Sequence, residues 1–355
     1  MPQDFLVQKD NLRETRTDDV PALVPGDGEA VLRVERFALT ANNITYGVAG
    51  DMIGYWQFFP AEAPMGRIPV WGTAEVTASK HPNVEVGQRF YGYFPMSHEL
   101  LVAPDQVSPR GFTDSAAHRA ALPPVYNQYS LMTADNGFDP AFDNHQVIYR
   151  PLFTTSFVLD DYFRDNNFFG AGQVILGSAS SKTAFGMAFM LRDKPVKVVG
   201  LTSPGNVAFV ESLGLYDSVF TYDDIASIDA SVPAAWVDMA GNRTVLAAVH
   251  NHLGDNLKCS CGVGITHWES RDGEAPASLP GAKPEMFFAP SQILKRNEEL
   301  GPAVYQQRIA EATAAFFGAV DSWVTVEEHP FSEVTDVYST VLEGPAADRA
   351  YVVTG

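Results

Sequence analysis

The sequence predicts an α/β protein in which a doubly wound parallel sheet follows a β-rich first domain. From about residue 28 to residue 110, short strands recur between turns that contain Pro and Gly, a pattern typical of a partly open β-barrel or sandwich. From residue 173 to residue 264, short apolar strands alternate with helices of about ten residues, which indicates βαβ units. The order of these two patterns along the chain predicts the fold class.

The length of 355 residues favours two domains, because a single hydrophobic core stops growing at about 250–300 residues. We expect a β-rich substrate domain over residues 1–130 and a dinucleotide-binding type of domain over residues 131–321. The ending, residues 322–355, predicts a strand, a helix and a strand that complete the first domain.

The strands of the first domain are expected in GEAVLRVERFALT, PVWGTAEVTASK, NVEVGQRFYGYFP and HELLVAPDQV. Residues 115–132 and 151–166 are rich in aromatic side chains and predict helices or helical turns. The strands of the second domain are expected in QVILG, VKVVGLT, DSVFTY, AAWVDMA and NLKCSCGVG, with helices between them. Residues 266–285 predict a polar surface loop, and residues 303–320 a long amphipathic helix.

The charge of the chain excludes several classes of partner. It carries 24 Lys and Arg against 43 Asp and Glu, a net charge of −19, so its surface repels nucleic acid and anionic membranes. No apolar run approaches the ~20 residues that span a bilayer. The beginning, MPQDFLVQKDNLRE, lacks the basic and apolar segments of a secretory signal, so we expect a cytoplasmic protein that acts on a small molecule.

The segment VILGSASSKTAFGMA joins a strand to a helix through the turn GSASSKT, residues 177–183, where α/β proteins bind phosphates. A P-loop requires six residues from its first glycine to its lysine and a second glycine directly before the lysine. Here Gly177 lies five residues before Lys182, and Ser181 takes the place of the second glycine. The turn is therefore not a P-loop.

A dinucleotide turn fits the position better, because this turn follows the first strand of the α/β run. Ser180 and Thr183 stand where later glycines are usual, and a serine hydroxyl can donate to a phosphate oxygen in place of the backbone. Lys182 opposes the helix dipole, which suggests that it binds an anion; the alternative is a solvated surface lysine. The expected phosphate-binding residues are Gly177, Ser178, Ser180, Ser181, Lys182 and Thr183.

The end of the second strand predicts the choice of cofactor. An NAD site places Asp or Glu there, whereas VVGLTSPGN offers Thr202, Ser203 and Asn206 and no carboxylate before Glu211. Neutral donors beside a lysine suit a 2′-phosphate, so we expect NADP(H). The remaining expected cofactor-binding residues are Tyr222, Gly262 and Phe288.

The motifs together resemble the zinc-free quinone and enoyl reductase branch of the medium-chain dehydrogenase/reductase superfamily. GEAVLRVERFALTANN is similar to the first strand of that branch, and PVWGTAEVTASKHPNVEVGQRFYGYFP to its Pro-x-x-Gly…Gly-Asp-Arg-Val core, with Gln88 in place of Asp. The turn SASSKT and the segment PLFTTSFVLDDYF resemble a member group of unknown function. The resemblance implies a Rossmann-type domain plus a GroES-like barrel, and a homodimer formed through an edge strand.

The sequence also departs from the zinc alcohol dehydrogenases of this superfamily. Thr40, Asn42 and Asn43 stand near the position of their cysteine ligand, and the loop of four cysteines is absent. Cys259 and Cys261 are one residue apart, with no further cysteine to complete a thiolate zinc site. We therefore expect no metal.

The resemblance places the substrate near TANNITYG and PPVYNQYSLM. Tyr46, Asn43 and Tyr129 are the expected catalytic residues, since a tyrosine can protonate an enolate or alkoxide. The expected substrate contacts are Tyr55, Trp56, Tyr126, Asn127 and Phe287. Tyr46 could instead be an aromatic on the barrel surface with an exposed hydroxyl, and the other aromatic residues could serve only to pack the domain interface. Asn42 and Asn43 could shape the turn.

The resulting hypothesis is an NADPH-dependent, zinc-free oxidoreductase that reduces an activated C=C or carbonyl of a small apolar or aromatic compound. Two alternatives stay open, because the turn has lost glycines that are usual in this fold. One is a binding or sensing module without redox chemistry, and the other is a lyase or isomerase.

Overall fold

The computed structural model describes residues 1–263 and 279–355. The chain forms two compact units, one of Met1–Tyr149 with Thr325–Gly355 and the other of Arg150–Val324. The sequence predicted the first boundary after residue 130, but residues up to Tyr149 belong to the first unit. Asp143 explains part of this difference, because its carboxylate pairs with Arg89 of the barrel at 2.7 Å. The sequence predicted that the chain re-enters the first domain at about residue 322, and in the structure the second unit ends at Val324.

The first unit is built on a β-barrel-like sheet. In the described part of the chain, its nine strands run in the order β17-β18-β3-β5-β6-β10-β9-β8, with β7 also paired to β3. The strands are β3 (Ala30–Leu39), β5 (Pro69–Ser79), β6 (Arg89–Pro95), β7 (Glu99–Val102), β8 (Pro104–Ser108), β9 (Gly111–Asp114), β10 (Gln128–Leu131), β17 (Thr325–Pro330) and β18 (Arg349–Thr354). Both ends of β3 are buried, and a register shift between Val34 and Arg36 brings Phe37 into the core with Leu32 and Val34.

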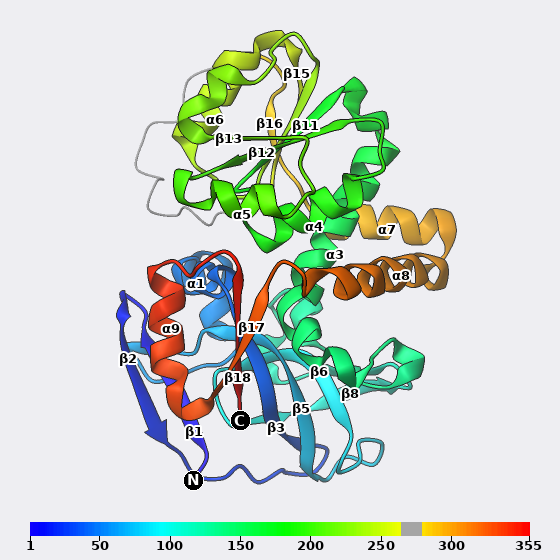
Figure 1. Cartoon of the computed structure of the whole chain (residues 1–355). Helices are drawn as coiled ribbons and strands as arrows, with labels where there is room; N and C mark the ends of the chain where they lie inside the picture. Colours follow the sequence, from blue (N-terminus) through cyan, green and yellow to red (C-terminus); the bar gives the residue numbers. More distant parts are fainter. Residues whose placement is uncertain (264–278) are drawn as a thin grey trace. The chain divides into compact units, whose positions relative to one another are not determined.

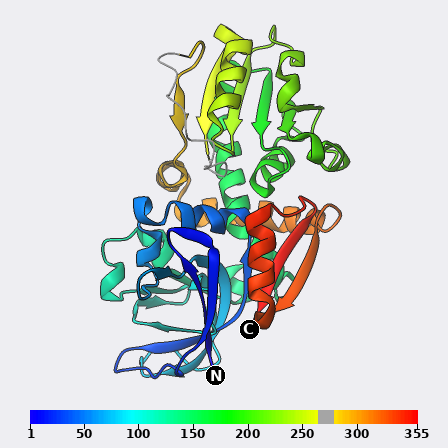
Figure 2. The same cartoon turned by 90° about the vertical axis from the view of Figure 1, so that its left-hand side faces the viewer.

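The carboxyl-terminal segment completes this sheet, as predicted. β17 and β18 pair in parallel, and β18 pairs antiparallel with β3, about 310 residues away in sequence. Between them, α9 (Val334–Glu343) buries Val334, Val337, Tyr338 and Val341, which recur at the spacing of one helix face. Figure 1 and Figure 2 show α9 beside these two strands.

Two segments of the first unit differ from the prediction. Residues 115–132, predicted to be helical, form two short 3₁₀ turns and the strand β10, because Pro123 and Pro124 interrupt a helix and QYSL pairs with β6 and β9. TANNITYG, expected to be a turn, contains the helix α1 (Ala41–Val48). The first unit also contains a small sheet of β1 (Gln3–Gln8), β2 (Asn11–Asp19) and β4 (Met65–Gly66), in the order β2-β1-β4.

The second unit holds a parallel sheet in the order β13-β12-β11-β14-β15-β16. This order is that of the doubly wound dinucleotide-binding fold, with a switch point between β11 and β14. The strands are β11 (Gln173–Gly177), β12 (Lys197–Thr202), β13 (Ser218–Thr221), β14 (Ala234–Asp238), β15 (Leu257–Gly262) and β16 (Pro284–Met286). β11 and β14 are buried at every residue, as expected for strands covered on both faces.

The sequence predicts four helices of the second unit, α4 (Lys182–Leu191), α5 (Val207–Ser212), α6 (Arg243–Leu253) and α8 (Pro302–Val320). It does not predict α7 (Ala289–Leu300). α3 (Asp143–Asp165) begins in the first unit and continues into the second, with Pro151 inside it. Most of the loop predicted for residues 266–285 lies outside the described residues, and its last part forms β16. Among residues 1–263 and 279–355, no helix combines the length and apolar character needed to cross a bilayer.

Candidate functional site

The turn that follows β11 lies at the carboxyl end of the parallel sheet, where ligands bind in doubly wound folds. Ser181 caps α4, because its hydroxyl accepts the N–H of Ala184 at 3.3 Å. The turn is tied to the next strand, since Ala179 donates its N–H to the carbonyl of Leu201 at 2.9 Å. Tyr216 donates its hydroxyl to the carbonyl of Ala179 at 2.8 Å. These contacts hold the amino terminus of α4 in one position.

The close packing of Trp236 against residue 177 requires a glycine at that position. A Cβ at this position would lie 2.4 Å from the ring of Trp236, which is 1% exposed on the adjacent strand β14. That distance is shorter than any ordinary van der Waals contact, so a side chain here would displace the indole. The requirement for glycine at the start of the turn therefore comes from Trp236.

Ser178 adopts a left-handed backbone conformation, with φ of 52°. Its N–H donates to the hydroxyl oxygen of Tyr222 at 3.0 Å. Burial raises the pKa of Tyr222 above its usual value, so this phenol keeps its proton at neutral pH. The Tyr222 oxygen therefore accepts the backbone N–H of Ser178, and Tyr222 also has a hydrogen bond with the side chain of Ser178.

Ser180 is arranged in the same way. Its hydroxyl oxygen accepts the side-chain N–H of Asn206 at 3.1 Å, and Asn206 follows β12. Within the described residues, the proton of this hydroxyl has no protein acceptor. Ser180 and Tyr222 therefore present two O–H donors near the amino terminus of α4, where the helix dipole favours an anion.

The remaining residues predicted around this turn lie on neighbouring elements. Lys182 is the half-buried first residue of α4. The carbonyl of Thr183 accepts the hydroxyl of Ser156 at 2.8 Å, which fixes α4 against α3. Thr202, 1% exposed, ends β12, and Ser203 follows it with a half-buried side chain. The structure thus brings these residues to the ends of two adjacent strands, as the sequence predicted.

Gly262 and the two phenylalanines belong to β15 and to the segment after β16, and β14 lies between β11 and β15 in the sheet. Gly262 ends β15, and its carbonyl accepts the N–H of Phe287 at 2.8 Å. Phe287 packs in an apolar cluster with Phe157 and Tyr305, so the structure gives it a packing role in place of the predicted substrate contact. Phe288 is 67% exposed.

A second group of functional side chains lies in the first unit. We define the tyrosine cluster as Tyr46, Tyr55, Tyr93 and Tyr126. Adjacent rings in the cluster have centroids 4.5–5.7 Å apart. The hydroxyls of Tyr55 and Tyr126 are hydrogen bonded at 3.1 Å. The oxygen of Tyr46 accepts the amide N–H of Asn42 at 2.7 Å and the indole N–H of Trp71 at 3.4 Å.

Burial controls the protonation of the tyrosine cluster. It raises the pKa of Tyr55 to about 12, and it raises the pKa values of Tyr46, Tyr93 and Tyr126 above the usual tyrosine value. For Tyr46, the hydrogen bonds from Trp71 and Asn42 lower the pKa and so oppose part of this effect. All four phenols hold their protons at neutral pH and can act as donors.

Tyr129 and Asn43, predicted to be catalytic, have structural roles instead. The hydroxyl of Tyr129 donates to the carbonyl of Tyr93 at 2.7 Å and accepts from Arg119 at 3.1 Å, and the residue is 1% exposed. Its proton is therefore not available to a substrate. Asn43 accepts the N–H of Thr40 at 2.8 Å and donates to the carbonyl of Pro69 at 3.0 Å. These contacts begin α1 and join it to β5.

Two predicted substrate contacts also belong to the core. Trp56 is 4% exposed and packs closely against Gly50 and Gly66. Asn127 is 7% exposed and donates to the carbonyl of Arg119 at 3.4 Å. Tyr55 is 8% exposed and belongs to the same core, whereas Tyr126 is half-buried at its border and remains the substrate candidate with the more accessible side chain.

The family model that matches the sequence is DUF2855, described as a protein of unknown function, and it covers residues 37–347. The chain belongs to the DUF2855 family. This agrees with the resemblance of SASSKT and PLFTTSFVLDDYF to a group of unknown function. No curated protein matches the sequence.

Solved structures similar to this DUF2855 chain include CurA from Vibrio vulnificus, at 14% identity and a TM-score of 0.62, over 100% of this chain and 98% of CurA. The complex of CurA with NADPH matches at 13% identity and a TM-score of 0.63, over 99% and 98% of the two chains. The yhdH oxidoreductase from Salmonella enterica in complex with NADP matches at 14% identity and a TM-score of 0.54, over 100% of both chains. At these identities the likeness concerns the fold, and it confirms the predicted Rossmann-type sheet with a GroES-like barrel.

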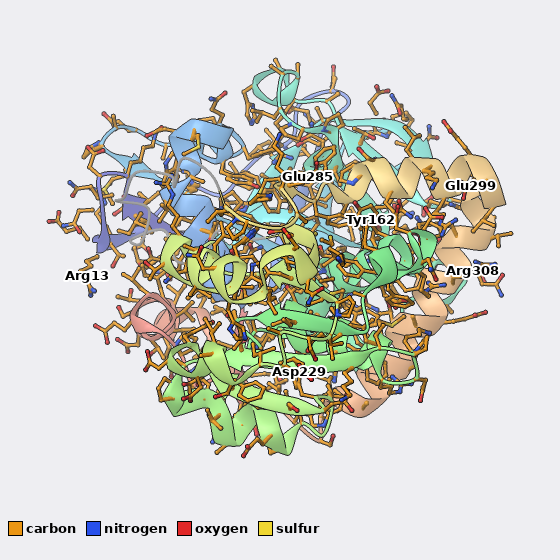
Figure 3. All side chains as sticks on the ribbon, turned by 90° about the horizontal axis from the view of Figure 1, so that it is seen from above. Arg13, Tyr162, Asp229, Glu285, Glu299 and Arg308 are labelled. Carbon is orange, nitrogen blue, oxygen red and sulfur yellow. The ribbon has the colours of Figure 1, made fainter. Side chains whose placement is uncertain are left out.

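The two cysteines of the DUF2855 chain lie on one strand, as predicted, near Tyr162 of α3 and Glu285 of β16, which Figure 3 labels. Burial, with a smaller effect of Glu285, raises the pKa of Cys259 to about 12, so its thiol is protonated and unreactive at neutral pH. In the described ranges, no group of three or more His, Cys, Asp or Glu side chains is arranged to hold a metal ion. That the protein works without zinc stays a prediction.

Sequence reasoning missed Trp71, Asp238 and the contact made by Asn42. Asp238 ends β14, is 7% exposed, and accepts the N–H groups of Ala240 and Gly241 at 2.9 and 2.8 Å. It therefore shapes the loop at the carboxyl end of the strand next to the turn. The position of Asp238 at the end of the strand AAWVD could have identified it, whereas nothing in the sequence connects Trp71 with Tyr46.

Proposed function

We propose that the chain is an NADPH-dependent oxidoreductase, working without catalytic zinc, that reduces an activated C=C or carbonyl of a small apolar or aromatic compound. The observation that carries this proposal is the pair of O–H donors from Ser180 and Tyr222 at the amino terminus of α4. Both oxygens accept an N–H of the protein, and each hydroxyl can rotate its proton toward a bound anion. An anion such as a phosphate is the group that two such donors and a helix dipole favour.

The end of β12 supports NADPH over NADH. Thr202, Ser203 and Asn206 occupy this position, and Lys182 stands in the first turn of the adjacent helix. A carboxylate in this position would accept from a ribose hydroxyl and repel a phosphate. Hydroxyl, amide and ammonium donors suit the 2′-phosphate. Bound NADPH supplies a hydride, and the side chains of the turn bind and orient its phosphates.

The tyrosine cluster supports reduction as the type of reaction. Addition of hydride to a conjugated acceptor leaves an enolate, and addition to a carbonyl leaves an alkoxide; each requires a proton. Tyr46 holds a proton at neutral pH, and aromatic rings surround it. An aromatic environment suits a flat or apolar acceptor.

Equilibrium titration with NADPH and NADH, followed by nicotinamide fluorescence, tests the cofactor. We expect Lys182→Ala to weaken NADPH binding about ten- to a hundredfold, because a hydrogen bond to a charged group contributes about 1.5–3 kcal/mol. NADH affinity should change little. Lys197→Ala is the matched control, since Lys197 is an exposed lysine at the opposite end of β12. Equal losses for NADPH and NADH would exclude a contact of Lys182 with the 2′-phosphate.

A binding module without redox chemistry is the second candidate, favoured by the bond between the Ser178 N–H and Tyr222, which occupies a backbone donor of the turn. The two candidates are separated by incubation with NADPH and a panel of enones, quinones and aldehydes. Oxidation of NADPH with any of them supports the reductase. Turnover of a substrate without NADPH would instead support a lyase or isomerase.

We also propose a homodimer formed through β16, the edge strand of the parallel sheet. Large apolar side chains on and beside this strand are exposed: Met286 is 66%, Phe288 67% and Leu294 61% exposed. Exposed apolar residues at a sheet edge favour association with a second copy. We expect sedimentation to give the mass of a dimer, and Met286→Asp to shift the protein to monomer. A monomer at micromolar concentration for the unchanged chain would contradict this.

A further inference from the structure

The four phenols of the tyrosine cluster differ in the donors that reach their oxygens. Tyr46 accepts from two N–H groups, one from Asn42 and one from Trp71. Tyr55 and Tyr126 share a single hydrogen bond, in which either hydroxyl can be the donor. Tyr46 is thus the member of this cluster with two nitrogen donors directed at its oxygen.

The two donors are fixed by the fold. Asn42 and Tyr46 are four residues apart on α1, so their side chains lie on the same face of the helix one turn apart. Trp71 lies on β5, where its ring stacks on Tyr91 at 5.5 Å and 11°. An indole nitrogen can only donate, so this contact cannot reverse its direction. The two N–H groups occupy both lone pairs of the Tyr46 oxygen, and a side-chain hydrogen bond also joins Tyr46 to Tyr93.

These donors have a larger effect on the charged form of Tyr46 than on the neutral form. A hydrogen bond to a charged oxygen contributes about twice as much as one to a neutral oxygen. When the phenol loses its proton, the Asn42 and Trp71 bonds therefore strengthen. Loss of a proton from Tyr55 or Tyr126 would leave a phenolate with the single bond from the other hydroxyl.

We propose that Asn42 and Trp71 are positioning residues that stabilise negative charge on the Tyr46 oxygen, and so make Tyr46 the proton donor of the cluster. The proposal rests on the reductase function proposed above. After NADPH transfers hydride to the acceptor, the O–H bond of Tyr46 breaks and its proton forms a C–H or O–H bond on the resulting anion. The phenolate of Tyr46 remains, hydrogen bonded to Asn42 and Trp71, until water returns the proton.

The surroundings of Tyr46 contain no competing charge. The groups that affect its pKa, apart from burial, are Tyr126 and Tyr93 of the cluster and the donors Trp71 and Asn42. No carboxylate and no cation is among them. Burial has the largest effect and raises the pKa of Tyr46, and the hydrogen bonds from Trp71, Asn42 and Tyr93 oppose it by favouring the charged form.

A fluorinated tyrosine at position 46 of the full-length protein measures this effect directly, because fluorine lowers the pKa of the phenol and the phenolate absorbs in the ultraviolet. We expect Asn42→Leu to raise the apparent pKa of this residue by about one to two pH units, since about 1.5–3 kcal/mol is lost from the charged form. Trp71→Phe keeps an aromatic side chain on β5 but removes the indole N–H, and it should also raise the pKa at position 46. Thr45→Ala is the control on α1, because Thr45 bonds to the carbonyl of Ala41.

The same fluorinated residue at position 126 should ionise at higher pH than at position 46, and Asn42→Leu should change it much less. An unchanged or lowered pKa at position 46 in both Asn42→Leu and Trp71→Phe would overturn the proposal. If circular dichroism shows that Asn42→Leu fails to fold, Trp71→Phe alone decides. The titration of the fluorinated tyrosine uses neither NADPH nor an acceptor. A failure of the protein to bind NADPH would therefore contradict the proposed function without changing the pKa values measured at position 46.

Discussion

Tyr46→Phe is expected to lower the rate of acceptor reduction by about 10²–10⁴-fold, the usual contribution of a positioned general acid. The substitution removes the hydroxyl and keeps the ring, which packs 4.5 Å from the ring of Tyr55. The affinity for NADPH should not change, because the turn that we assign to the cofactor lies in the other structural unit. Stopped-flow measurement of NADPH oxidation, together with a binding titration, gives both quantities.

Tyr126→Phe is the matched control, because it removes a hydroxyl from the same cluster and leaves the Asn42 and Trp71 bonds to Tyr46 intact. Its effect on the rate should be at least tenfold smaller. Burial raises the pKa of Tyr46 above the ordinary value of 10.0, so the donor stays protonated at neutral pH and the rate should fall only at alkaline pH. Equal losses in the two variants would show that Tyr46 is not the specific donor.

Arg119→Met is expected to lower the free energy of unfolding by about 3–5 kcal/mol, because it breaks a buried ion pair. Arg119 and Asp114 lie 3.1 Å apart with side chains 1% exposed. The substitution leaves the carboxylate of Asp114 buried without its cation. It also removes the hydrogen bond from Arg119 to the hydroxyl of Tyr129 and the contact of the guanidinium with the ring of Phe59.

Chemical denaturation measures this loss, with Arg33→Met as the control. Arg33 and Glu75 form a surface pair in the same unit at 2.7 Å, with side chains 57% and 32% exposed. Water screens such pairs, so the control should cost less than about 1 kcal/mol. The double substitution Arg119→Met with Asp114→Asn should recover part of the loss, because it removes the uncompensated charge. A small and equal effect of Arg119→Met and Arg33→Met would contradict the account of this pair.

The sequence was sufficient to predict the parallel sheet, the phosphate turn and the return of the carboxyl-terminal strands, because periodicity and turn residues are local signals. The sequence was not sufficient to predict the hydrogen bonds made by the side chains around the turn. The donors of Ser178 and Asn206 reach partners 44 and 26 residues away in the chain, Tyr222 and Ser180 respectively. These bonds form only after β12 has paired with β11 and β13 has paired with β12.

The choice between neighbouring tyrosines was likewise beyond the sequence. Tyr126 and Tyr129 are both polar aromatics in PPVYNQYSLM, but only Tyr129 meets Arg119 and the carbonyl of Tyr93. Its hydroxyl is therefore satisfied within the core, whereas that of Tyr126 joins the cluster around Tyr46. The long-range pairing of β10 with β6 determines this difference, and no local pattern reports it.

The central claim is that the hydroxyls of Ser180 and Tyr222, with Lys182, bind a phosphate of NADPH at the amino terminus of α4. A crystal structure of the protein grown with NADPH tests it most directly. We predict density for a phosphate of the dinucleotide within hydrogen-bond distance of the Ser180 and Tyr222 hydroxyls. Dinucleotide bound elsewhere, or no density beside residues 177–183 at a saturating concentration, would contradict the account.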